Sequence, residues 1–542
     1  MIRRIFRPNP ATTSPAYNGF SPKPTPTATF GASKRFNYIG KSMMKFFVRL
    51  STSLILGVLI FHFSGVNAQS SAPFLYYYNQ AQGAFIIERA DGSDSRILAN
   101  FEISPSQPDQ EVHPIIVGPG WPPSGQWFAW RESTNYGGVS SAHIVNKDGH
   151  AITILDDAYV AVMKWSPTDD KLLVTRRASG EQPFWYDVYI IDPQNPDHPV
   201  QIRDSLQYNV PSYDYTDWTP DGRYVVQYSM DKLGDSKMEM ATVDGTITTR
   251  DFYRSEIDCG IPAWSSDSKV AYVTADRKAF ILENTVTGEV SQLQPPTGNI
   301  QRMVWSPDGR NILSFASTDC SKFAEDLDMW LASTQGITLI AEHVKLPFSS
   351  TLPYQFLNLG EWSQDSHYAY FTSADELFVL DAFTKSIVSN VSQKKGDIIS
   401  IAWLSDNQLA FIQTAQYNLD ALDPDSQKIA PLLPENTFLV QKFTLSPDAG
   451  YIAYSGQGFH IANLQTQQTV DVDVSRGIPG EINYGDNGYI REIRWHPSED
   501  WVIVETGDHF GPVYVSNADG SIQRTLTVCA SNPSCFGWLP ES

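Results

Sequence analysis

The sequence predicts an all-β fold, a β-propeller of about ten four-stranded blade modules, on the basis of three observations. A short motif, seen as "WSPDGRNIL" at Trp305, recurs at intervals of 41 to 57 residues. Each copy is followed by short runs of β-branched and aromatic residues bounded by Gly, Pro, Asp and Asn. No long helical period follows residue 69. A repeat of this length is typical of four-stranded propeller blades.

Each copy of the motif is anchored by a Trp, or once by a Leu, directly before a reverse turn. In the turn after Trp305, Pro fixes φ, Asp can accept hydrogen bonds from the turn backbone, and Gly can adopt a positive φ. The Trp can bury a large flat surface between adjacent blades. Because a catalytic pair is needed only once, we interpret Ser306 and Asp308 as scaffold. The structural repeat anchors are Trp121, Trp165, Trp218, Trp264, Trp305, Trp362, Trp403, Leu445, Trp495 and Trp538.

Four strands are expected within each repeat. In the unit that begins at Trp165 they are "AVMKWSP", "KLLVTRR", "WYDVYIID" and "PVQIRD". Asp-Gly dipeptides, as in "NADGS" at residues 517–521, indicate tight hairpins between the third and fourth strands.

The two ends of the repeat region complement each other. Residues 74–100 contain the second, third and fourth strands of a module, and "CFGWLP" at the C-terminus is a first strand with no partner. Pairing these N- and C-terminal strands would close a ring and remove its exposed edges. Counting this composite module gives ten, whereas propellers usually have four to eight blades. A single large ring is favoured because only one split module is visible, and two tandem propellers are the alternative.

The quoted motifs resemble the WD-like propeller repeats of the TolB family and of the dipeptidyl peptidase IV propeller. The resemblance covers about residues 74–540 and implies the fold. The chain has no room for the small α/β domain that precedes the TolB propeller, or for the hydrolase domain of the peptidases. It also lacks a G-x-S-x-G elbow. The resemblance therefore implies no activity.

The N-terminal region differs from the repeats. Residues 1–42 are basic and rich in Pro, Thr and Ser, and we expect them to be disordered. Residues 43–68 have a basic start, a short apolar core and small residues before Ala68, which predicts a cleaved signal peptide. An uncleaved anchor is the alternative. Residues 69–542 then form the propeller, exported to the periplasm, the cell surface or the medium.

The predicted propeller is strongly acidic. Residues 1–68 contain nine Lys or Arg and no Asp or Glu, so residues 69–542 carry 30 basic and 60 acidic side chains, a formal charge of −30. This charge argues against nucleic acid or an anionic membrane surface as a partner. We expect a monomer that contacts a membrane only if the signal segment stays attached.

A binding role is predicted, with a protein, peptide or glycan as the partner. The connections between second and third strands, and between blades, are long and share one face, where function tends to lie. A simpler interpretation is that these loops only cover the strand ends. The candidate binding residues on this long-loop face are Tyr213, Tyr215, Tyr484, Tyr489, Arg491 and His509.

Signals for chemistry are weak. The ten His residues are dispersed, and no zinc-protease, phosphate-loop or dinucleotide motif occurs. "DVDVS" at Asp471 could suggest calcium, but alternating Asp is typical of a solvated outer strand. We therefore predict no catalytic residue, cofactor or metal ligand. The alternatives are a propeller hydrolase or lyase with its site in the central channel, and a structural module of an envelope complex.

Disulfide bonds are expected if the chain is exported. The positions of the four cysteines in the predicted blades favour the pairs Cys259–Cys320 and Cys529–Cys535.

Overall fold

The computed structural model describes residues 72–540, apart from residues 80–81, 101–114, 134–139, 159, 178–184, 208–215, 231–235, 254–258, 319–325, 346–359, 374–375, 393–397, 406, 414–416, 434–439, 441, 457, 475–489, 507–511 and 527–534. The predictions for residues 1–42 and 43–68 lie outside the described residues. Among the described residues, no helix has the length and apolar character needed to cross a membrane.

The described residues form forty strands. The first twenty are β1 Phe74–Asn79, β2 Ala84–Arg89, β3 Arg96–Asn100, β4 Ile115–Gly120, β5 Trp127–Ser133, β6 Ser140–Asn146, β7 Ala151–Ala158, β8 Val160–Trp165, β9 Leu172–Arg177, β10 Trp185–Ile191, β11 Val200–Gln207, β12 Thr216–Trp218, β13 Tyr224–Met230, β14 Ser236–Thr242, β15 Ile247–Phe252, β16 Ala263–Trp264, β17 Lys269–Val273, β18 Phe280–Asn284, β19 Val290–Leu293 and β20 Asn299–Trp305.

The second twenty are β21 Asn311–Ser317, β22 Asp326–Ser333, β23 Gly336–Lys345, β24 Glu361–Trp362, β25 Tyr368–Thr372, β26 Glu376–Asp381, β27 Ser386–Ser392, β28 Ile398–Trp403, β29 Leu409–Gln413, β30 Asn418–Asp423, β31 Lys428–Pro431, β32 Lys442–Leu445, β33 Tyr451–Ser455, β34 Phe459–Asn463, β35 Thr469–Val472, β36 Ile490–Trp495, β37 Trp501–Thr506, β38 Val513–Asn517, β39 Gln523–Leu526 and β40 Phe536–Trp538.

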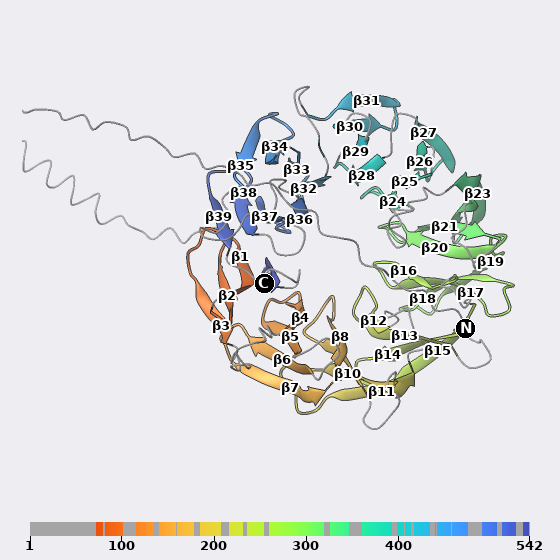
Figure 1. Ribbon diagram of the computed structural model, residues 1–542. Helices are drawn as coiled ribbons and strands as arrows, with labels where there is room; N and C mark the ends of the chain where they lie inside the picture. The colour runs from red at the N-terminus through yellow and green to blue at the C-terminus, as the bar shows by residue number, and fades with distance from the viewer. Residues whose placement is uncertain are drawn as a thin grey trace, which may run out of the picture. The chain divides into compact units, whose positions relative to one another are not determined.

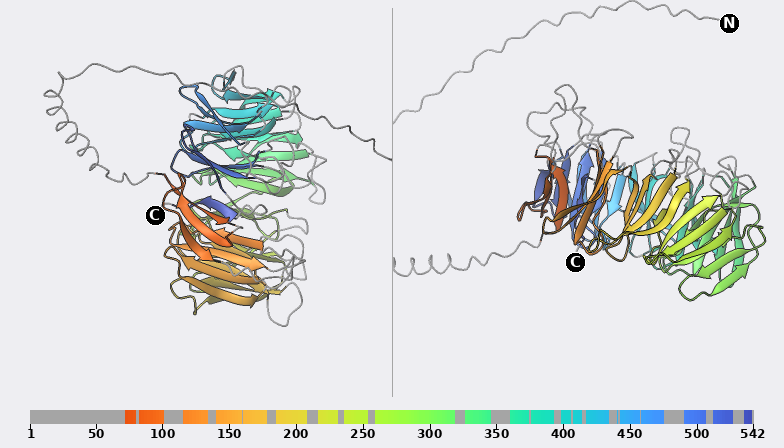
Figure 2. Two further views of the ribbon diagram at one scale, coloured as in Figure 1. Left: turned by 60° about the vertical axis from the view of Figure 1, so that its left-hand side comes forward. Right: turned by 90° about the horizontal axis from the view of Figure 1, so that it is seen from below.

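The strands form ten four-stranded antiparallel sheets arranged as the blades of one ring (Figures 1 and 2). We number the blades in chain order. Blade 1 consists of β40, β1, β2 and β3, blade 2 of β4–β7, blade 3 of β8–β11, and so on to blade 10, which is β36–β39. The first strand of each blade is innermost and the fourth outermost (Figure 1). The predicted propeller of about ten blades in a single ring is confirmed.

Blade 1 closes the ring as predicted. Strand β40 pairs with β1 in antiparallel register, with Leu75 opposite Trp538 and Tyr77 opposite Phe536. The outermost strand of blade 10 adds a second link to blade 1. The guanidinium of Arg524 forms an ion pair of 2.6 Å with the buried Glu88 carboxylate and donates to the carbonyl oxygen of Arg89 at 3.2 Å.

The apolar core lies between blades. Each cluster of buried residues draws on two neighbouring blades, or three around blade 1. One example joins Leu313 and Phe315 of blade 6 to Ala369 and Phe371 of blade 7. The second strands face a neighbour on both sides, and every residue of β25 and β37 is buried. This explains why these strands read as continuous apolar runs rather than as alternating patterns.

The anchor tryptophans connect successive blades through one repeated hydrogen bond. The indole N–H of Trp362 donates to the carbonyl oxygen of Val304, the residue directly before Trp305, at 3.1 Å. Seven anchors donate in this way to the residue before the preceding anchor, at 2.8 to 3.3 Å: Trp165, Trp218, Trp305, Trp362, Trp403, Trp495 and Trp538. At each of these joints the anchor Trp is therefore the donor, and the residue before the preceding anchor is the acceptor.

Three joints depart from this pattern. Trp264 donates instead to the hydroxyl of Tyr228 at 3.0 Å. Leu445 has no side-chain donor, and the buried indole nitrogen of Trp121 has no hydrogen-bond partner among the described residues. Anchor burial also varies, because Trp121, Trp165, Trp218 and Trp362 are buried whereas Trp305 is half-buried.

Candidate functional site

The Ser and Asp of the repeated motif bond to each other and to the turn. The Ser306 hydroxyl donates to Asp308 at 2.6 Å and accepts from the backbone N–H of Asn311 at 3.0 Å. Gly309 has a positive φ of 63°. Equivalent Ser/Thr–Asp pairs, at 2.5 to 2.7 Å, occur at Thr219–Asp221, Ser265–Asp267, Ser363–Asp365 and Ser446–Asp448. These side chains complete the turns through hydrogen bonds within them.

Hydrogen bonds in two of the propeller's turns lower the pKa values of their carboxyl groups. The hydrogen bond from Ser446, together with the backbone N–H of Gly450, lowers the pKa of Asp448. The pKa of Asp519 is lowered in the same way by the hydroxyl and N–H of Ser521. A lowered folded-state pKa contributes stability that is present above the unfolded pKa, about 3.9, and is lost as the pH falls through the folded value.

We therefore expect the melting temperature to change little with these groups above about pH 4 and to fall below it. Asp448→Asn should reduce the size of the fall, because one of the contributing carboxylates is gone. Melting curves recorded by circular dichroism between pH 7 and 2.5 test this. A melting temperature that stays constant down to pH 3 would contradict it.

Of the six residues predicted for the long-loop face, Tyr213, Tyr215, Tyr484, Tyr489 and His509 lie outside the described residues. Arg491 is described and lies at the start of β36, where the inter-blade connection enters the innermost strand. Its guanidinium pairs with Glu505 at 2.9 Å, and its carbonyl oxygen accepts from Lys442 at 2.7 Å. Arg491 therefore links β36 to β37 and blade 10 to blade 9.

Two of the four cysteines are described. Cys259 and Cys535 are both buried, and neither is a free cysteine in the structure. Cys320 and Cys529 lie outside the described residues, so the pairing stays a prediction. Peptide mapping without reduction should recover Cys259–Cys320 and Cys529–Cys535. A cross-pairing such as Cys259–Cys529 would contradict the proposed loop positions.

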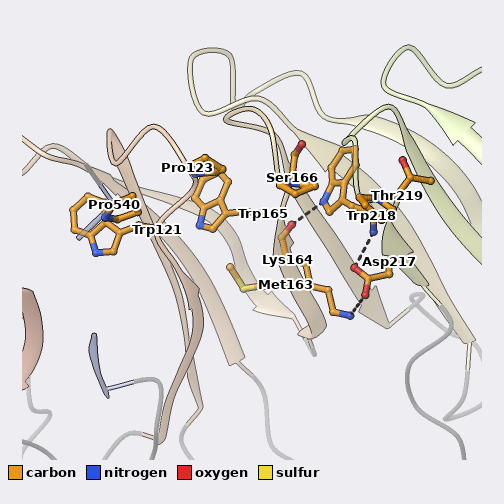
Figure 3. Close-up of a pocket in the computed structure, with 12 residues that line it drawn as sticks. Trp121, Pro123, Met163, Lys164, Trp165, Ser166, Asp217, Trp218, Thr219 and Pro540 are labelled. Atoms are coloured by element: carbon orange, nitrogen blue, oxygen red, sulfur yellow. Dashed lines mark hydrogen bonds and ion pairs between the residues drawn. The ribbon is translucent and has the colours of Figure 1, made fainter. Parts of the chain in front are cut away.

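An open recess of about 600 Å³ lies where the innermost strands of blades 2 to 4 enter their first turns (Figure 3). Trp121, Trp165 and Trp218 line it at successive blades, and the Lys164–Asp217 ion pair, at 2.7 Å, supplies its charges. The hydroxyl-bearing Ser166 is fully buried in its turn. The other residues that line the recess are Pro123, Met163, Pro167, Thr219, Pro220 and Pro540. This lining offers apolar contact and one charge pair.

A second set of inter-blade contacts joins Arg residues of outer strands to Glu residues of the next blade. Arg250 on the fourth strand of blade 4 holds Glu283, on the third strand of blade 5, through three contacts of 2.7 to 3.2 Å. Hydrogen bonding to Glu283 raises the pKa of Arg250. Arg203 and Glu239 make the same contact between blades 3 and 4, as Arg524 and Glu88 do at the closure. Sequence reasoning missed these pairs, because an Arg in an outer strand gives no indication of its partner.

No group of three or more His, Cys, Asp or Glu side chains within the described ranges is arranged to hold a metal ion. Asp471, considered for calcium, lies in β35, the outermost strand of blade 9, and bonds to the ring nitrogen of His460 at 2.7 Å.

These observations define a ten-bladed β-propeller with WD-like repeats. No family model matches the sequence, and no curated protein matches it. The chain is similar in fold to a solved eukaryotic initiation factor, with 11% identity, a TM-score of 0.47, and coverage of 87% of this chain and 99% of that one. It is also similar to the C-terminal WD40 domain of Sif2, with 12% identity, a TM-score of 0.33, and coverage of 65% and 95%. Likenesses at this level carry no function across.

Proposed function

We propose that this protein is an exported β-propeller that acts as a binding scaffold, holding a protein, peptide or glycan partner on its long-loop face. The observation that carries the proposal is the asymmetry of the connections. In blade 6 the first turn joins Trp305 to Asn311, and the last joins Ser333 to Gly336. The connection between its second and third strands runs from Ser317 to Asp326, and the link to blade 7 from Lys345 to Glu361.

The rest of the chain supports a scaffold. The polar side chains of the short turns form hydrogen bonds within those turns. Neighbouring blades are joined by indole hydrogen bonds and Arg–Glu ion pairs. A frame of this kind can keep long loops in fixed positions without taking part in recognition. The aromatic and polar residues Tyr213, Tyr484 and His509 supply contact groups in three of these connections.

The test compares partner capture by two sets of variants. In the first, residues 208–215 and 476–489 are each replaced by a Gly-Ser linker of equal length. The matched control is Val286→Ser with Phe383→Ser, which changes exposed apolar residues on turns of the opposite edge. Cross-linking and mass spectrometry on the cells that export the protein should give partners that the first variant loses and the control keeps. Equal partner lists from the two variants would refute the long-loop face.

The proposed export leads to a separate prediction. The mature chain should begin at Gln69, because the small residues at 66–68 follow a short apolar core. N-terminal sequencing of protein recovered from the exported fraction tests this. Recovery of a chain that still carries residues 1–42 would contradict it.

A further inference from the structure

The wall of the ring differs in charge from the rest of the propeller. The ten innermost strands, β4, β8, β12, β16, β20, β24, β28, β32, β36 and β40, contain five basic residues and three acidic ones. Their formal charge is therefore +2, although residues 69–542 together carry −30. The basic residues are Lys164, Arg302, Lys442, Arg491 and Arg494, and the acidic ones are Asp217, Glu361 and Glu492.

Nearly all of these side chains have protein partners. Lys164 pairs with Asp217 at 2.7 Å, Arg491 with Glu505 at 2.9 Å and Arg494 with Glu492 at 2.6 Å. The ammonium group of Lys442 donates to a backbone carbonyl, and Glu361 accepts from the hydroxyl of Tyr370 at 2.8 Å. Pairing of this kind is expected, because a charge removed from water without a partner costs free energy.

Arg302 is the exception. It lies in β20 of blade 6 and is half-buried, and burial lowers its pKa. Its charged and polar neighbours are Glu361 and Tyr370 of blade 7, which act on it only through space. In the part of the chain that the structure describes, no hydrogen bond or ion pair engages its guanidinium. Among the described residues, the side-chain nitrogens of Arg302 have no hydrogen-bond partner, and none of them is completely buried. The guanidinium is therefore in contact with solvent.

We propose that Arg302 is the docking point for an oxyanion, a carboxylate or a phosphate group, that enters the ring of innermost strands. The planar guanidinium presents paired N–H donors that match two oxygens of such a group. The formal charge of −30 on residues 69–542 would repel an anion elsewhere, whereas no ion pair among the described residues neutralises the charge of Arg302. The bound oxyanion forms the ion pair that Arg302 lacks among the described residues.

The test measures binding of two probes to the full chain at constant ionic strength. One probe is pyrophosphate, for a phosphate source, and the other is a labelled deca-glutamate peptide, for a carboxylate source. We expect saturable binding of at least one probe, weakened about tenfold or more in Arg302→Gln and less in Arg302→Lys, which keeps the charge but loses the paired donors. Arg310→Gln is the matched control, since this exposed Arg lies on the first turn of the same blade.

Stability provides an independent readout. An arginine that only supports the fold would lower the melting temperature when replaced. Arg302→Gln should leave it unchanged or raise it in the absence of ligand, because a partly buried unpaired charge is removed. Failure of both probes to bind the wild type, or equal binding by Arg302→Gln, would overturn the proposal. The long-loop variants described above should retain probe binding, so that failure of one proposal does not imply failure of the other.

Discussion

A chain shortened to residue 535 should associate with other copies of itself. The deletion removes β40, and with it the hydrogen-bonding partner of Leu75, Tyr76 and Tyr77 in β1. It also removes Phe536, which is 1% exposed within the cluster that spans blades 10, 1 and 2. An unpaired edge with a continuous buried face is a template for pairing with other chains.

Size-exclusion chromatography with light scattering measures the outcome, and we expect the shortened chain to form larger species than the full-length chain does. The control is a chain shortened only to residue 540, which leaves β40 intact. A deletion variant with the molar mass and melting temperature of the full-length chain would mean that β40 contributes little to closure.

Trp362→Ala should lower the free energy of unfolding by about 3–5 kcal/mol. The indole is 5% exposed and packs between blades 6 and 7. The substitution leaves a cavity and also leaves the carbonyl oxygen of Val304 without its donor. Urea unfolding followed by tryptophan fluorescence and circular dichroism gives the change.

Trp362→Phe separates the two causes. It keeps most of the apolar contact and loses the hydrogen bond, so its cost should be about 1–3 kcal/mol. Val286→Ala, at an exposed position, should change stability by less than about 0.5 kcal/mol. If Trp362→Ala is no more costly than that control, the anchors do not hold the joints.

The blades could be predicted from the sequence because their signals are local. A turn such as the one after Trp305 needs Pro, Asp and Gly at fixed positions, and the strands beside it contain short runs of β-branched residues. Closure could be predicted because the two incomplete modules at residues 74–100 and 536–538 supply what the other lacks. The ring is confirmed for these reasons.

The contacts between blades could not be predicted in this way. The carbonyl oxygen that Trp362 bonds to belongs to Val304, 58 residues earlier, and any side chain could stand there. Glu283 and Arg250 look like ordinary surface residues until the register of two sheets brings them together. Ser306 is another case, because the sequence indicates a turn but not a hydroxyl that bonds at both ends of it. Arg302 has no ion pair among the described residues, and this likewise depends on the positions of all its neighbouring side chains, which the sequence does not reveal.

The pairing of β1 with β40 also has a consequence during synthesis. The first strand of the propeller to leave the ribosome must wait for the last one, about 450 residues later. At typical elongation rates of about 5–20 residues per second, the inner edge of β1 stays open for roughly 20–90 s. Blades 2 to 10 can each pair their own strands in that interval, whereas the buried face around Tyr76 and Phe85 cannot be completed. The nascent chain therefore exposes an unpaired apolar strand until β40 is synthesised, and a chaperone that protects the growing propeller would be most needed at residues 74–79.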